Sequence, residues 1–91
     1  MLYEIRNHWL IKENGKRIEL TNLEHKMLII LSNETITTYS ELAKSLYNTE
    51  INKYVKSAIC VLKSRLQKKT KIKIKSIRNT GYVLKTKIYF N

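Results

Sequence analysis

The sequence of 91 residues contains no aspartate and no proline, and it has one cysteine. The lack of aspartate argues against metal-dependent nucleases, which hold divalent cations with clustered carboxylates, and it removes one member of a hydrolase triad. The single cysteine, Cys60, excludes an internal disulfide framework and fits a reducing, cytoplasmic environment. No apolar run approaches the roughly 18 residues of a membrane-spanning helix, and the charged N-terminus lacks a signal-peptide core.

Potential ligands for a metal or cofactor are scarce. His8, His25 and Cys60 fall in three different predicted elements without metal-ligand spacing, so we expect no metal, no cofactor and no enzymatic activity. No small-molecule ligand is evident from the sequence. A chain of this length forms one domain, residues 1–91. We expect strands in residues 1–20, a three-helix core in 21–69, and a basic hairpin with a C-terminal strand in 70–91.

Acidic residues are missing from the second half of the chain. Residues 1–50 carry seven glutamates and six basic residues, whereas residues 51–91 carry twelve basic residues and no acid, which produces the net charge of +11. A solubility surface mixes both signs, so an acid-free half predicts a polyanionic partner. Nucleic acid is the first interpretation. An anionic membrane surface and a solvated face without a partner remain open alternatives.

The first twenty residues predict strands. Residues 2–5 favour a short strand, and Asn14-Gly15 favours a hairpin with a two-residue type I′ turn, since both residues tolerate a positive φ. Pairing outward from that turn places two pairs of apolar side chains opposite one another. We expect all four to lie on the core face: Trp9, Ile11, Ile18 and Leu20.

Three helices follow. Thr21-x-x-Glu24 and Thr38-x-x-Glu41 are capping boxes that predict the first two starts, and the β-branched "TITT" between them predicts a brief strand. The third helix is predicted over residues 52–69. Its apolar residues recur at i, i+4, i+7 and i+11 and form one core stripe: Val55, Ile59, Leu62 and Leu66.

The segment "KIKIKSIRNTGYVLK" at residues 71–85 predicts a basic hairpin. Isoleucines alternate with Lys71, Lys73 and Lys75, so the lysines point away from the core. The alternation breaks at Ser76-Ile77, which indicates a bulge or the start of the turn. Asn79 and Gly81 can supply the left-handed conformation of a tight tip. Residues 88–90 either close the N-terminal sheet or contact a partner.

This order of elements is that of a winged helix-turn-helix, an α+β fold with a short N-terminal antiparallel sheet, three helices and a C-terminal hairpin wing. The stretches "LTNLEHKMLIIL", "TYSELAKSLYN", "VKSAICVLKSRL" and "SIRNTGYVL" resemble, in that order, the OmpR/PhoB-type DNA-binding domain. The resemblance implies a recognition helix in the third stretch and a DNA-contacting arginine, Arg78, in the wing. The chain departs from the family in lacking a receiver domain, in Cys60-Val61 where adjacent arginines are common, and in Asn79 for a wing glycine.

The resemblance implies a sequence-specific double-stranded DNA-binding protein, with transcriptional regulation as the first role. A helix fits the major groove, flanking lysines neutralise phosphates, and a wing arginine suits a narrow minor groove. We therefore expect DNA contacts from three places. They are Thr37 and Thr38 before the second helix; Lys53, Tyr54, Lys56, Ser57, Cys60, Val61, Lys63, Ser64 and Lys68 on the third; and Lys71, Lys73, Lys75, Arg78, Asn79 and Thr80 in the wing.

Several alternatives remain open at this level. The helix lysines could merely solvate an amphipathic helix, Arg78 could be an arginine on an exposed turn, and Cys60 could be a redox switch or a small surface residue. On the same fold, the rival role is an architectural protein of a mobile element that binds an origin of plasmid transfer (conjugation) or of replication. An RNA-binding module is the rival from another class. For the oligomeric state, we expect a weak homodimer or two copies bound to tandem repeats of the DNA site.

Overall fold

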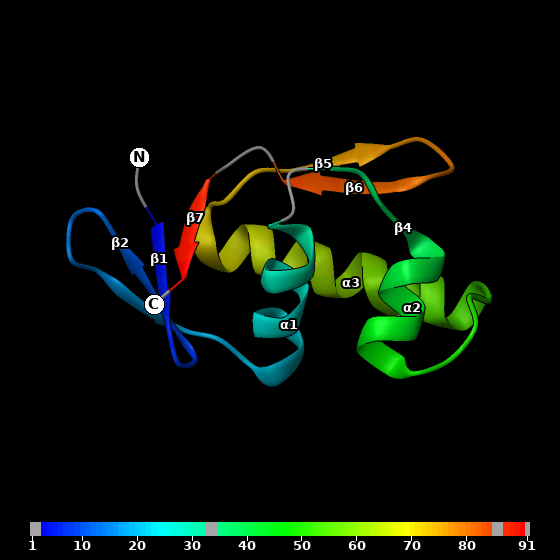
Figure 1. Cartoon of the computed structure of the whole chain (residues 1–91), viewed down its shortest axis with the longest axis horizontal. Coiled ribbons are helices and arrows are strands. Elements are labelled where there is room, and N and C mark those ends of the chain that lie inside the picture. The colour runs from blue at the N-terminus through cyan, green and yellow to red at the C-terminus, as the bar shows by residue number, and fades with distance from the viewer. Residues whose placement is uncertain (1–2, 33–34, 85–86, 91) are drawn as a thin grey trace.

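The structure is a computed structural model that describes residues 3–32, 35–84 and 87–90. The molecule is elongated, 38 Å by 21 Å by 21 Å, with a sheet at one end, the helices in the middle and a hairpin tip at the other end (Figure 1). The described elements confirm the predicted winged-helix order. They are β1 (Tyr3–Arg6), β2 (Trp9–Lys12), β3 (Arg17–Glu19), α1 (Asn22–Leu31), β4 (Thr37–Thr38), α2 (Tyr39–Tyr47), α3 (Lys53–Thr70), β5 (Ile74–Ile77), β6 (Gly81–Leu84) and β7 (Ile88–Phe90).

The N-terminal sheet has four strands in the order β3-β2-β1-β7. The first three strands are antiparallel, and β7 runs parallel to β1 with Ile88 opposite Tyr3. This pairing confirms the expectation that the C-terminal segment closes the sheet. The side chains of Tyr3, Ile5, Leu10 and Ile88 are buried against the helices.

The predicted two-residue turn between β2 and β3 is wrong. The Gly15 N–H donates to the Lys12 carbonyl and the Lys12 N–H to the Lys16 carbonyl, both at 2.8 Å, so the loop has three residues. Of the loop residues, Gly15 alone has a positive φ, 86°, and Asn14 does not adopt the left-handed conformation that a type I′ turn needs. Asn14 instead accepts a hydrogen bond from the Lys16 N–H through its side chain at 2.9 Å.

The extra loop residue shifts the pairing register by one. Trp9 lies opposite Glu19 and Leu10 opposite Ile18, instead of Trp9 opposite Leu20. Because a shift of one residue turns every side chain of a strand to the other face, Leu10 is fully buried and Trp9 is 42% exposed. The expectation that Trp9 and Ile11 cover the core is therefore wrong for β2, while Ile18 and Leu20 do pack on it.

The predicted helix starts are confirmed. Thr21 Oγ1 accepts from the Glu24 N–H at 3.2 Å and Glu24 Oε1 from the Thr21 N–H at 2.8 Å, which completes the capping box of α1. Thr38 Oγ1 caps α2 by accepting from the Glu41 N–H at 3.2 Å. The Asn52 side chain caps α3 by accepting from the Tyr54 and Val55 N–H groups of the first turn, at 2.9 and 3.0 Å. None of the helices in the described part of the chain is both long and apolar enough to cross a bilayer.

The core lies where the three helices meet the two sheets. The predicted stripe of α3 is confirmed, since Ile59, Leu62 and Leu66 are buried and Val55 packs beside them. Leu42 and Leu46 of α2 are buried opposite that stripe. This packing leaves the remaining faces of α3 open, and it therefore decides which side chains a ligand can reach.

A second sheet joins the hairpin to the helices, with the strand order β4-β6-β5. Thr37 lies opposite Tyr82, and Thr38 lies opposite Gly81. A Cβ atom on Gly81 would lie 1.9 Å from the Thr37 carbonyl oxygen, so the close approach of β4 requires glycine here. Our expectation that Gly81 supplies a left-handed conformation is wrong; Asn79, with φ 59°, supplies it.

Candidate nucleic-acid interface

The outward face of α3 is covered by small and basic side chains. Ser57, Val61 and Ser64 recur at helical spacing on the side opposite the core stripe, and all three are exposed. Val61 is 50% exposed, which is high for an apolar side chain. Lys53 and Lys68 flank them near the two ends of the helix and are also exposed. The face combines groups that can contact base edges with cations that can neutralise phosphates.

A second stripe of α3 faces the hairpin. Lys56, Cys60 and Lys63 lie at i, i+4 and i+7, and Cys60 Sγ accepts a hydrogen bond from the Tyr82 hydroxyl at 3.4 Å. Burial, with a smaller contribution from Cys60, raises the pKa of Tyr82 far above its ordinary value of 10, so its hydroxyl is a neutral donor at physiological pH. Cys60, which we expected on the helix surface, is half-buried by this contact.

Two tyrosines connect the three elements of this surface. Tyr39 of α2 and Tyr82 of β6 form an edge-to-face pair with ring centroids 5.4 Å apart. The Lys56 ammonium lies 4.9 Å from the Tyr39 ring centroid, and the Lys63 ammonium lies 5.6 Å from that of Tyr82. Such cation–π contacts restrict flexible lysine side chains and hold them on the side of α3 that faces the hairpin and the start of α2. Neither tyrosine is among the contact residues predicted from the sequence.

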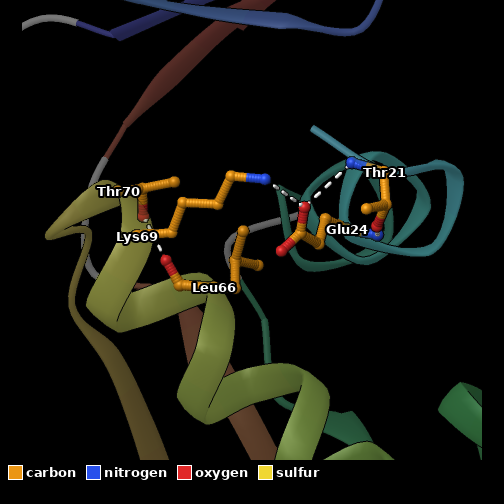
Figure 2. Close-up of polar contacts among 5 residues, drawn as sticks. All are labelled: Thr21, Glu24, Leu66, Lys69 and Thr70. Atoms are coloured by element: carbon orange, nitrogen blue, oxygen red, sulfur yellow. Dashed lines mark hydrogen bonds and ion pairs between the residues drawn. The ribbon is translucent and has the colours of Figure 1, made fainter. Parts of the chain in front are cut away.

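The base of the hairpin is fixed to the end of α3. The buried Thr70 hydroxyl donates to the Leu66 carbonyl at 2.7 Å (Figure 2) and accepts from the Ile72 N–H at 3.2 Å. Gln67 Oε1 accepts from the Ile74 N–H at 2.7 Å. Lys71 caps α3 in the left-handed conformation, so our expectation that it belongs to the hairpin strand is wrong, although its side chain is exposed.

Beside the base of the hairpin, Glu24 of α1 forms an ion pair with the end of α3. Lys69 Nζ lies 3.0 Å from Glu24 Oε1, the oxygen that also accepts the Thr21 N–H (Figure 2). Burial raises the pKa of Glu24, but the bonds from Thr21 and the charge of Lys69 outweigh it and leave the pKa below its ordinary value of 4.5. Lys69 is therefore held in an ion pair within the fold, although its own side chain is exposed.

The hairpin tip presents exposed polar and basic groups. The Thr80 N–H donates to the Ile77 carbonyl at 3.0 Å, and the Thr80 hydroxyl to the Arg78 carbonyl at 3.2 Å. The turn thus begins after Ile77, and Ser76 and Ile77 are regularly paired and form no bulge. Arg78, Asn79 and Thr80 are exposed. Lys73, which precedes β5, and Lys75 within it are exposed as well.

Most of the predicted contact residues gather on these surfaces. Thr37 is the exception: it is fully buried, with its hydroxyl unpartnered, because β4 pairs with β6 beneath the surface. The prediction that the Thr37 side chain contacts DNA is therefore wrong. Thr38 is half-buried and serves as the α2 cap. The exposed set comprises Lys53, Tyr54, Lys56, Ser57, Val61, Ser64, Lys68, Lys71, Lys73, Lys75, Arg78, Asn79 and Thr80, with Cys60 and Lys63 half-buried beside them.

The structure also brings together residues that the sequence analysis kept apart. The rings of His8 and His25 lie edge to face with centroids 4.9 Å apart. Burial, and then the neighbouring His8, lower the pKa of His25, which favours the neutral form of His25. Among the described residues, no group of three or more potential metal ligands is found.

Arg65, exposed on α3 and absent from our predicted contacts, adds a guanidinium beside Val61.

Solved structures of similar shape are DNA-binding domains of OmpR/PhoB-family response regulators. The DNA-binding domain of CssR from Bacillus subtilis has a TM-score of 0.79 at 20% identity, covering 90% of this chain and 98% of that one. AdeR, solved in complex with an intercistronic region, has a TM-score of 0.76 at 20% identity, covering 94% and 96%. Klebsiella pneumoniae RstA, in complex with the RstA box, has a TM-score of 0.69 at 23% identity, covering 90% and 95%.

These likenesses confirm the OmpR/PhoB-type winged-helix fold that the sequence motifs predicted. No curated protein matches the chain in sequence. Residues 7–81, from the β1–β2 turn to the start of β6, match the family model described as the SipA N-terminal domain. The match spans most of the chain, and the protein therefore belongs to the SipA N-terminal domain family, built on an OmpR/PhoB-type winged helix.

Proposed function

We propose that this protein is a sequence-specific double-stranded DNA-binding protein that acts as a transcriptional regulator, with no catalysis and no cofactor. The observation that carries the proposal is the location of the acid-free half of the chain in the structure. Residues 51–91 supply α3 and the hairpin, the two elements that present exposed cations side by side. Two of the similar domains, RstA and AdeR, were solved with DNA, which supports duplex DNA as the polyanion.

In the proposed complex, α3 enters the major groove. Its outward face carries the short side chains Ser57, Val61 and Ser64, which allow close approach to base edges, and Val61 suits contact with a thymine methyl group. Lys53 and Lys68 at the two ends of the face neutralise phosphates and fix the register of the helix on the duplex.

The hairpin is proposed to lie along the adjacent minor groove. Arg78 at its tip is exposed, and a narrow A·T-rich groove attracts an inserted guanidinium. Lys73 and Lys75 follow the phosphate backbone beside it. The half-buried joint of Gln67 and Thr70 holds the base of the wing against α3, so the two reading elements approach DNA as one unit.

Lys56 and Lys63 are proposed to contact phosphates between the helix and the wing. Their ammonium groups rest on the rings of Tyr39 and Tyr82, so less side-chain freedom is lost when DNA binds than for a free lysine. The α2 N-terminus lies at the same junction, where the helix dipole favours a phosphate, although the Tyr39 and Glu41 amides already donate to the Thr80 carbonyl and the Thr38 hydroxyl. As to stoichiometry, we propose a weak homodimer or two copies on tandem repeats.

The proposal is tested by fluorescence anisotropy with a labelled duplex over a range of salt concentrations. If about five to seven phosphates are contacted, log K falls with log salt at a slope of roughly −4 to −6 per copy. Lys63→Ala reduces the slope by about one, whereas Lys26→Ala, an exposed lysine on α1, leaves it unchanged. A slope near zero, or displacement of the duplex by equal amounts of duplex RNA, would overturn the proposal.

The finer role is tested by selecting bound fragments from genomic DNA and sequencing them. Sites upstream of promoters support transcriptional regulation. Sites clustered at a single origin of transfer or replication would instead support the architectural role and contradict transcriptional regulation.

A further inference from the structure

The four-stranded sheet has an outer face that no helix covers. Because Tyr3, Ile5 and Leu10 point inward, the alternate residues of each strand point outward. Strand register aligns them in two rows that cross the sheet. The first row is Arg17, Ile11, Glu4 and Tyr89, from β3 to β7. The second row is Glu19, Trp9 and Arg6.

Apolar groups occupy the middle of this face. Trp9 and Ile11 lie on the inner strand β2, where Trp9 is 42% exposed and Ile11 partly exposed, and Tyr89 on the edge strand β7 is 47% exposed. Large aromatic side chains are enriched in the centres of protein interfaces, because they bury much area at little conformational cost. A shallow hollow lined by Ile11, Glu4 and Tyr89 lies beside them.

The charges of the face mix both signs, unlike the acid-free second half of this +11 molecule. Arg17 and Glu19 stand on β3, and Glu4 and Arg6 on β1, with Arg6 and Glu4 paired at 3.0 Å. Each of these two strands thus carries one arginine and one glutamate, one in each row. A second copy of a strongly basic protein is repelled by every basic surface but meets no net repulsion on a balanced face.

The pattern is self-complementary under one simple operation. A two-fold axis that runs across the strands, midway between the two rows, exchanges the rows and keeps each strand over its own equivalent. It places Arg17 opposite Glu19 of the second copy, and Ile11 opposite Trp9 of the second copy. On β1 it places Glu4 opposite Arg6 of the second copy, so the existing ion pair extends into a network.

We propose that the outer face of the N-terminal sheet binds a second copy of this chain, face to face about that two-fold axis. The sheets pack about 10 Å apart, as in a β-sandwich. The contact lies at the end of the long axis away from the hairpin tip (Figure 1), so the two basic wings stay apart. This proposal does not rest on DNA binding, since it uses none of the residues assigned to the DNA interface.

The size of the face sets the strength of the contact. Four strands about 4.8 Å apart and four residues of about 3.3 Å each give a face of roughly 250 Å². That is about a third of the roughly 800 Å² per partner of a standard stable interface. We therefore expect a weak dimer with Kd on the order of 10–500 µM, which adjacent binding on one duplex would strengthen by effective concentration.

Two-fold symmetry has a consequence on DNA. An isologous dimer presents its recognition helices to half-sites in inverted orientation, whereas tandem copies without this contact occupy direct repeats. Of the two arrangements proposed above, the sheet face therefore favours the homodimer. The orientation of the half-sites in selected DNA fragments distinguishes the symmetric dimer from tandem copies. Either orientation is compatible with the proposed DNA binding, so the result tests the dimer alone.

Trp9 is the only tryptophan in the chain, so its fluorescence reports directly on this face. The experiment follows tryptophan emission and sedimentation-equilibrium mass from about 1 µM to 1 mM protein, at about 0.3 M salt to screen long-range repulsion. We expect a blue shift and a doubling of mass over the same concentration range. A constant emission maximum and a monomeric mass at 1 mM would overturn the proposal.

Charge swaps test the register itself. Arg17→Glu and Glu19→Arg each place like charges opposite one another and should weaken association at least about tenfold. The double variant Arg17→Glu/Glu19→Arg restores the opposite-sign pairs and should recover dimerisation. Arg17→Glu is the sharper single variant because it lowers the net charge, which would strengthen non-specific association. Lys44→Glu on α2, with the same change in net charge, should dimerise at least as well as wild type. If the single swaps dimerise like wild type, a different surface holds the dimer and the proposal fails.

Discussion

Gly81→Ala should destabilise the fold far more than an alanine substitution usually does. The new Cβ atom would lie 1.9 Å from the Thr37 carbonyl oxygen and 2.8 Å from both the Thr37 carbonyl carbon and the Thr38 Cα. Cβ atoms essentially never approach another heavy atom within 3.0 Å, so β4 and β6 must separate by more than 1 Å. All three atoms belong to the backbone, and no side-chain rotation can relieve the contact.

The cost follows from what the separation breaks. Overpacking in a well-packed region costs about 1–3 kcal/mol, and weakening one or two backbone hydrogen bonds costs about 0.5–1.5 kcal/mol each. The bonds at risk join β4 to β6 and the Tyr39 N–H to the Thr80 carbonyl at 3.0 Å. The total is about 2–5 kcal/mol, which lowers the Tm of a domain of this size by about 10–30 °C.

The assay is thermal unfolding followed by circular dichroism. Gly15→Ala is the matched control, because its Cβ meets nothing within 4 Å but sits at a φ of 86°. It should cost only the left-handed strain of about 1–2 kcal/mol. If Gly81→Ala unfolds within about 2 °C of wild type, or loses less than Gly15→Ala, the close approach of β4 to β6 is not a constraint and the reasoning is wrong.

Three further predictions concern the interface and its support. Arg78→Ala should weaken binding by about 1–3 kcal/mol on a specific duplex and relax A·T preference beside the major-groove site, while Ser57→Ala costs less; isotherms on specific and scrambled duplexes check this. Because the pKa of Glu24 is lower in the folded state, its ionised carboxylate stabilises the fold above the unfolded-state pKa, and this stabilisation is lost as the pH falls below 4.5. Glu24→Gln should therefore flatten the dependence of Tm on pH in that range, as measured by thermal unfolding. If Tyr39 acts by positioning Lys56, the affinity losses of Tyr39→Leu and Lys56→Ala are not additive, and Tyr39→Phe binds like wild type; additive losses would contradict the positioning role.

Local signals in the sequence predicted most of the helical core. The capping residues Thr21 and Thr38 act on amides three positions away, and the stripe from Val55 to Leu66 depends on helical period alone. Such features need no knowledge of distant contacts, and the structure confirms them. The wing tip and its left-handed Asn79 were predictable for the same reason.

What the sequence could not supply depends on contacts between distant segments or on choices that are nearly equal in energy. Asn14-Gly15 suits both a two-residue and a three-residue hairpin loop, and the burial of Leu10 instead of Trp9 selects the longer one. Thr37 looked accessible because nothing in its neighbourhood indicates that β6 will cover it. The approach of Tyr39 to Tyr82 likewise joins residues more than forty positions apart.

The support of the wing bears on how reading is divided between helix and hairpin. The outward face of α3 offers Ser57, Val61 and Ser64, none of which can make the bidentate guanine contact that is the commonest specific readout, and Arg65 beside Val61 is the one arginine of this helix. Arg78 can supply a guanidinium only at a position that is fixed relative to α3. The bonds at Gln67 and Thr70 fix the base of the hairpin, and the close approach at Gly81 and the Tyr39–Tyr82 contact fix its middle. In the proposed DNA complex, we expect a rigid wing with an arginine at its tip to compensate for the short side chains on the outward face of α3 and to carry an unusually large share of the affinity.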